Sequence, residues 1–106
     1  MSTGEGQLIR QRPAVVLPLV GELDVTGATA AIKQMLALEL PRGAQLVLDM
    51  RGLTFMDSTG VRLILQAQEH ARKHGAELVV VRPPEHVMRV LELVGLDGQL
   101  DVVDEF

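Results

Sequence analysis

Apolar residues along the chain follow two patterns, one typical of buried strands and one typical of helices. Residues 14–20, 45–50 and 77–82 are nearly continuous apolar runs, which predict strands that are covered on both faces. Two shorter segments, 7–11 and 100–103, predict short strands toward the two ends of the chain. The stretch between the second long strand and Asp57, residues 51–56, is interpreted as a connecting loop.

Helical spacing of apolar residues appears between these strands. It predicts a first helix over residues 25–40 and a second that begins near Asp57 and ends at Gly75. A third helix follows Pro84 and ends at Gly95. The apolar face of the second helix is expected to hold Val61, Ile64, Leu65 and Ala71.

Strands that alternate with helices predict an α/β fold, in which a mostly parallel sheet is joined by right-handed crossovers. Pro18 interrupts the first long strand. Because proline has no N–H to donate, we expect it at a β-bulge or where no partner faces its nitrogen. The 106 residues suffice for one domain, and the small polar residues 1–6 predict a flexible, frayed end.

Composition and charge exclude several classes of function. The net charge is −4, the ten Lys and Arg residues form no run, and Tyr and Trp are absent, so no direct contact with nucleic acid is expected. An effect on transcription would therefore pass through another protein. The lack of Cys excludes disulfides, thiol nucleophiles and cysteine metal sites. Short apolar runs and a polar N-terminus predict a cytoplasmic protein with no membrane partner.

The segment Phe55-Met56-Asp57-Ser58-Thr59-Gly60-Val61 resembles the signature of STAS domains, in the branch of the anti-sigma factor antagonists. Other landmarks of that family are similar to residues 21–24, 46–50, 74–78 and 90–96, in the right order and spacing. The resemblance implies a single STAS domain over residues 1–106, with a mixed, mostly parallel sheet of four or five strands packed against three or four helices. It implies no active site.

In this branch, the serine after the aspartate is phosphorylated by a partner that is both a serine protein kinase and an anti-sigma factor. The resemblance places this acceptor at Ser58, with Thr59 as the second choice. It implies that the unphosphorylated protein binds the partner and frees a sigma factor, that phosphorylation releases the partner, and that a separate phosphatase resets the switch. The expected partner-binding residues are Glu22, Asp24, Asp57, Ser58, Thr59, Gly60 and Arg62. Arg62 departs from the family pattern, since many relatives have a small residue there.

The residues by themselves also suit a phosphate switch. A hydroxyl at a helix start lies near unpaired N–H groups and the positive end of the helix dipole, where a phosphate is tolerated. In an interface, however, a phosphate adds about −1.5 to −2 charge beside Asp57 and Asp24. Repulsion across a dry contact costs several kcal/mol, and each 1.4 kcal/mol is about tenfold in affinity. Gly60 would keep the turn open for a kinase.

Simpler roles remain open for the same residues. Asp57 or Ser58 can be a plain N-cap, and taken alone the four-residue segment favours that interpretation. A residue can also cap while Ser58 is modified. Asp24 could position Ser58 or the partner's nucleotide, or it could only cap the first helix. Glu22 and Asp24 are expected to be solvated loop charges rather than a catalytic pair.

No motif in the chain indicates catalysis, a cofactor or a metal. The sequence contains no Gly-x-Ser-x-Gly, no P-loop and no Gly-x-Gly-x-x-Gly, so we expect neither an enzyme nor a cofactor. His70 and His74 have the i, i+4 spacing of metal ligands, but their polar neighbours predict ordinary surface histidines. Two further hypotheses stay open: an unphosphorylated STAS module that serves as a scaffold or small-ligand subunit of a larger assembly, and a weak NTP-binding protein.

Overall fold

The structure is a computed structural model that describes residues 12–106 of the chain. The strand predicted at residues 7–11 and the frayed end predicted at residues 1–6 lie outside the described residues.

Four strands form one sheet in the described part of the chain. They are β1 (Ala14–Leu23), β2 (Gln45–Met56), β3 (Glu77–Val81) and β4 (Asp101–Val103), and they lie side by side in this order. Every neighbouring pair is parallel. The predicted α/β class with a mostly parallel sheet is therefore confirmed.

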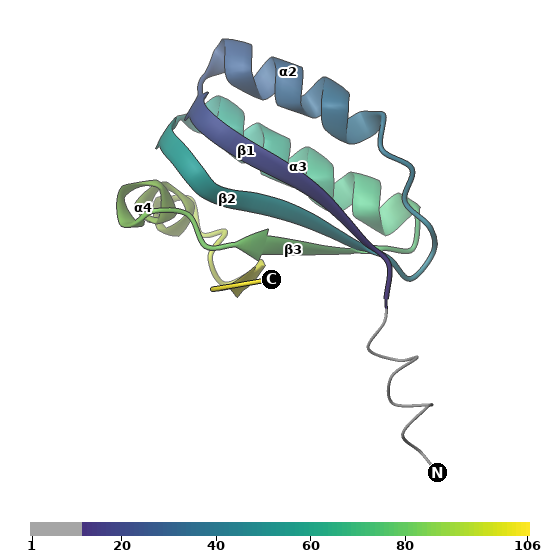
Figure 1. Ribbon diagram of the computed structural model, residues 1–106. Helices are drawn as coiled ribbons and strands as arrows, with labels where there is room; N and C mark the ends of the chain where they lie inside the picture. Colours follow the sequence, from purple (N-terminus) through teal and green to yellow (C-terminus); the bar gives the residue numbers. More distant parts are fainter. Residues whose placement is uncertain (1–11) are drawn as a thin grey trace.

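Three helices alternate with these strands: α2 (Val25–Leu36), α3 (Ser58–Lys73) and α4 (Glu85–Leu93). Figure 1 shows α2 and α3 side by side along one face of the sheet, with α4 close to the carboxyl end of β2. α2 ends before the predicted position at residue 40, because the chain after it turns and places Leu40 in the core.

The apolar side chains of the sheet alternate between its two faces, as the pleat requires. Leu46 and Leu48 of β2 are fully buried beneath α2 and α3. Val47 points to the opposite face, where it packs with Val79 and Val81. Each such side chain contributes about 1.5–3 kcal/mol relative to an exposed one. The two helices contribute Ala28, Ala31, Met35, Leu63, Ile64 and Ala67 to the core.

Two stretches that lie beyond the predicted strands are parts of strands in the structure. The prediction of a loop at residues 51–56 is wrong, because β2 continues through them, and β1 continues through residues 21–23 in the same way. The two extensions pair with each other in parallel. The register between β1 and β2 shifts after Pro18 and again after Gly21, which lets the two strands stay paired although their segments differ in length. Pro18 thus lies next to an irregularity in the pairing of β1 with β2, where its missing N–H is tolerated.

The buried face of α3 differs from the predicted one in two places. Leu65 is 47% exposed, whereas its neighbour Leu63 is fully buried. His70 is only 9% exposed, with its Nε2 atom 3.4 Å from the Leu38 carbonyl oxygen, so its prediction as a surface histidine is wrong. The loop after α2 covers His70, which the spacing on α3 alone could not indicate.

Candidate functional site

The predicted site residues gather where β1 and β2 end. Leu23 pairs with Met56 at the carboxyl ends of these strands, and the N–H of Asp57 lies 3.5 Å from the Leu23 carbonyl oxygen. Asp24 follows β1 and Asp57 follows β2, and each is directly followed by a helix. Figure 1 shows α2 and α3 starting together at this edge of the sheet. The topology therefore brings two distant acidic turns together.

Both aspartates are N-caps. The carboxylate of Asp24 accepts a hydrogen bond from the N–H of Gly27 at 2.9 Å, which caps α2. The carboxylate of Asp57 accepts one from the N–H of Thr59 at 2.9 Å and another from the Thr59 hydroxyl. These bonds, led by that from the hydroxyl, hold the pKa of Asp57 below its usual range. Asp57 is therefore a fixed negative charge beside Ser58 at neutral pH.

The two helix starts share the pattern Asp-x-Thr-Gly: Asp24-Val25-Thr26-Gly27 and Asp57-Ser58-Thr59-Gly60. In each, the glycine is the third helical residue and lies against the preceding strand. A Cβ atom at Gly27 would lie 2.3 Å from the Glu22 carbonyl oxygen, and one at Gly60 would lie 2.3 Å from Met56 Cγ. Neither position has room for a side chain, so both glycines set how closely a helix approaches the sheet.

This packing corrects the interpretation of Gly60 as a residue that keeps the turn open. Gly60 is buried, and a Cβ there would also come within 3.0 Å of Leu23. Its physical role is close packing of α3 on the ends of β1 and β2. Its predicted contact with a partner stays a prediction.

Ser58 and Thr59 occupy different environments although they are adjacent. Ser58 is the first residue of α3, is exposed, and its hydroxyl makes no hydrogen bond within residues 12–106. Thr59 is half-buried, and its hydroxyl donates to the Asp57 carboxylate. An enzyme that approaches from solvent therefore meets the Ser58 hydroxyl, while reaching Thr59 requires breaking a cap.

An exposed stripe runs along α3 from Ser58 through Arg62 to Leu65, at the i, i+4, i+7 spacing that places residues on one helix face. Ser58 and Arg62 are among the predicted partner-binding residues, whereas the helical spacing of apolar residues wrongly assigned Leu65 to the core. The signal that could have found it is its spacing from Ser58.

Apolar side chains also flank the acidic turn on the strand side. Glu22 is exposed and pairs across the sheet with Phe55, which is 46% exposed. Val25, the first residue of α2, is 63% exposed. The surface therefore combines carboxylates, a free hydroxyl and exposed apolar groups, which is the composition of a protein-binding patch. Phe55 is one of two aromatic residues in the chain, and that rarity could have drawn attention to it.

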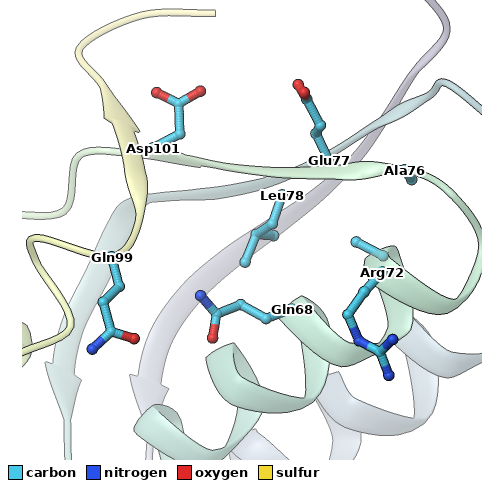
Figure 2. Close-up of a pocket in the computed structure, with 8 residues that line it drawn as sticks. Gln68, Arg72, Ala76, Glu77, Leu78, Gln99 and Asp101 are labelled. Atoms are coloured by element: carbon cyan, nitrogen blue, oxygen red, sulfur yellow. The ribbon is translucent and has the colours of Figure 1, made fainter.

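A hollow on the described surface lies at the other end of α3. It is an open groove of about 410 Å³ between α3 and β3, lined by Gln68, Ala71, Arg72, Ala76, Glu77, Leu78, Gln99 and Asp101. Figure 2 shows Gln68, Leu78 and Gln99 directed toward this space, whereas Glu77 and Asp101 point to the other side of the strand. Arg72 is paired with Glu69. The groove thus brings no acid and base together.

Over residues 12–106, no three His, Asp or Glu side chains come together in a way that could hold a metal ion. In the same range, no helix is both long and apolar enough to cross a bilayer.

Comparison with known proteins agrees with this geometry. The family model described as "Mlab, STAS domain" matches residues 7–104, and the chain therefore belongs to the STAS domain family. Over 101 residues it is 31% identical to the anti-sigma F factor antagonist of Paenibacillus polymyxa, with 92% of this chain and 85% of that protein covered. Over 84 residues it is 26% identical to the anti-sigma-B factor antagonist of Bacillus subtilis strain 168, with 79% and 76% covered. These relatives are named as factor antagonists rather than as enzymes.

Solved structures share the fold. The anti-sigma factor antagonist SpoIIAA in its unphosphorylated form superimposes with a TM-score of 0.70 at 24% identity, over 90% of this chain and 84% of that one. A sulfate transporter family protein from Wolinella succinogenes gives a TM-score of 0.73 at 22% identity, over 88% and 78%. At such identities the likeness establishes the fold alone, and the same fold occurs in regulators and in transporters.

Proposed function

We propose that this protein is an anti-sigma factor antagonist controlled by phosphorylation of Ser58. Unphosphorylated, it binds an anti-sigma factor that is also a serine protein kinase, and so frees a sigma factor. Phosphorylated, it releases that partner, and a phosphatase restores the serine. The names of its curated relatives support the anti-sigma factor as partner. Such a partner places the protein in the cytoplasm.

The observation that carries the proposal is the contrast between the two adjacent hydroxyls. Ser58 is exposed and makes no hydrogen bond within residues 12–106, whereas Thr59 is committed to the cap of α3. A phosphate on Ser58 leaves the Asp57 cap in place, and the start of a helix tolerates an anion. The fold can therefore persist in both states, as a reversible switch requires.

Charge explains how one phosphate can end binding. Asp57 is held ionised by Thr59, so the surface around Ser58 is already negative in the unphosphorylated protein. Phosphorylation adds about −1.5 to −2 charge at the same place. A partner whose surface fits the unphosphorylated form then faces added negative charge in a dry contact, at a cost of several kcal/mol.

The transfer step needs only groups that the partner supplies. The Ser58 Oγ attacks the γ-phosphorus of ATP, the Oγ–P bond forms, and the bond from that phosphorus to the bridging oxygen of ADP breaks. The hydroxyl proton passes to a base of the kinase. A phosphatase later adds water across the Oγ–P bond and returns serine and inorganic phosphate.

The test is intact mass after incubation with Mg-ATP and candidate anti-sigma factor kinases. We expect the wild type to gain one phosphate, Ser58→Ala to gain none, and Thr59→Val to gain one, since Thr59 serves the cap. Phosphorylation of the Ser58→Ala variant would instead indicate that Thr59 is the acceptor. A stable complex in which no variant is ever modified would refute the switch and leave a constitutive binding module.

The likeness to a sulfate transporter family protein and to the STAS domain of a transporter favours a second candidate: an unphosphorylated STAS subunit of a larger assembly. In that case the same exposed surface would be a permanent contact. The two candidates differ in one observable, because only the antagonist changes its affinity for a partner when Ser58 carries phosphate.

A further inference from the structure

Arg62 lies on the exposed stripe of α3, one turn after Ser58. Both side chains are exposed, and residues at i and i+4 on a helix are neighbours with Cβ atoms about 5–6 Å apart. The order is also favourable, because an anion four residues before a cation on a helix stabilises it better than the reverse arrangement. A phosphate on Ser58 would thus lie within reach of the Arg62 guanidinium.

Arg62 differs from most other arginines of the described chain in having no ion-pair partner there. Residues 12–106 contain seven arginines, and five of them form ion pairs: Arg12–Glu77, Arg51–Asp49, Arg72–Glu69, Arg82–Asp104 and Arg89–Glu85. Arg42 forms none, but its side chain lies over Gly75. Within the described residues, Arg62 is therefore the arginine that lies exposed beside the acceptor Ser58 and forms no ion pair.

The start of α2 provides the contrast. Val25 corresponds to Ser58, and the residue four positions later is Thr29, whose hydroxyl donates to the Val25 carbonyl oxygen at 2.6 Å. No cation stands at that position of α2. The pairing of a hydroxyl with an arginine one turn later thus belongs to α3 alone of these two helices.

We propose that Arg62 is a phosphate clamp: when Ser58 is phosphorylated, the guanidinium of Arg62 pairs with the phosphate and is no longer available to bind the partner. The inference rests on the proposed function for the origin of the phosphate. A guanidinium suits this task because its planar set of donors matches phosphate oxygens. Phosphorylation then acts twice, by adding negative charge and by occupying the guanidinium of Arg62, which the partner can no longer pair with.

The experiment installs phosphoserine at position 58 during translation, by genetic code expansion, and follows its ³¹P chemical shift against pH. The second pKa of phosphoserine is about 6, and a nearby cation lowers it by favouring the dianion. We expect the midpoint to rise by about 0.3–0.7 pH unit in Arg62→Gln, the range of an exposed ion pair. Arg62→Lys should restore part of the difference.

Arg72→Gln is the matched control, since it removes the same charge from the same helix at a residue paired with Glu69. It should leave the ³¹P midpoint unchanged within about 0.1 pH unit. Arg72 lies farther from the phosphate at position 58 than the Debye length, so salt screens the interaction between the two charges. Equal midpoints in the wild type and Arg62→Gln, or equal shifts in the two variants, would overturn the clamp.

This titration needs no kinase and no partner. It can therefore succeed while the mass experiment fails, which would refute the proposed function and leave the local pairing intact. It can also fail while the mass experiment succeeds, which would leave a switch that works by added charge alone. Both variants are on exposed residues, and equal melting temperatures would show that the midpoints report the local charge.

Discussion

Two helices start side by side where β1 and β2 end, and both starts contain the pattern Asp-x-Thr-Gly. In both, an aspartate caps the helix and a glycine allows the helix to approach the strand closely. At the first helical residue they differ, because α2 has Val25 and α3 has Ser58. The shared residues serve packing and capping, so the two helix starts differ at the residues that point outward.

The residues that follow strengthen this contrast. One turn further, α2 has Thr29 and α3 has Arg62, and α3 then exposes Leu65 on the same stripe. A partner that recognises α3 can therefore use a hydroxyl, a cation and an apolar side chain in a row. Since α2 offers a different row, we expect the kinase to recognise its acceptor through the α3 stripe.

The sharpest way to break the comparison is to move the serine. The double variant Val25→Ser, Ser58→Ala gives α2 the segment Asp-Ser-Thr-Gly and removes it from α3. Because recognition depends on the α3 stripe, we expect phosphorylation by the partner kinase to be lost and not to appear at position 25. Peptide mapping by mass spectrometry checks this. Efficient phosphorylation of the new serine would mean that the four-residue segment is sufficient by itself.

Substitution of either glycine should destabilise the fold, because both glycines pack a helix against a strand. In Gly27→Ala the new methyl group meets a backbone oxygen, whereas in Gly60→Ala it meets the Met56 side chain, which can adjust. We expect losses in the free energy of unfolding of about 2–3 kcal/mol for the first and about 1–2 kcal/mol for the second, measured in urea.

Gly98→Ala is the control for these variants, because a Cβ there has nothing within 4 Å. It should be neutral or slightly stabilising. Equal stability of Gly27→Ala and Gly98→Ala would contradict the packing role assigned to both helix starts.

Leu65 tests whether the stripe on α3 extends beyond Ser58. Since Leu65 is half-exposed, Leu65→Ala should change the free energy of unfolding by no more than about 0.5 kcal/mol. It should weaken partner binding by about 1–2 kcal/mol, the cost typical of an interface anchor, as measured by calorimetry. Leu93→Ala on α4, which is also exposed, should leave binding unchanged. Equal effects of the two substitutions on partner binding would mean that the partner contacts the start of α3 but not Leu65.

The smallest expected effect concerns Asp57 and pH. The folded pKa of Asp57 is lowered, chiefly by the Thr59 hydroxyl, so its charged form adds stability above the unfolded pKa of about 3.9. This contribution is lost as the pH falls through the lowered pKa. The difference in unfolding free energy between the wild type and Asp57→Asn should therefore be constant near neutrality and shrink below about pH 4. A difference independent of pH would contradict the ionised cap.

The sequence predicts well the two capped helix starts and the parallel sheet that position the site, because capping residues and strand–helix alternation are visible in local sequence. An aspartate directly before an amphipathic helix is a common N-cap, and both Asp24 and Asp57 prove to be caps. The alternation of strands and helices fixes a parallel sheet, which brings the two turns to the same edge. The phosphorylation of Ser58 stays a prediction, because the geometry of an unmodified serine does not show whether a kinase acts on it.

The parts that the sequence does not predict depend on contacts between distant segments. Residues 63–65 are all apolar, and only the packing of α3 on the sheet decides that Leu63 is buried and Leu65 exposed. His70 is buried by the loop that contains Leu38. Gly60 needs to be a glycine because of Met56. Spacing along one helix contains none of this information.

The measurement that tests the central claim most directly is the affinity of the partner kinase for two forms of this chain, with serine or with phosphoserine at position 58. The partner is the anti-sigma factor kinase identified by the mass experiment, with a non-hydrolysable ATP analogue to prevent turnover. We predict that the phosphate weakens binding at least a hundredfold, or about 2.7 kcal/mol, while the melting temperature changes little. Equal affinity for both forms would contradict a switch at Ser58.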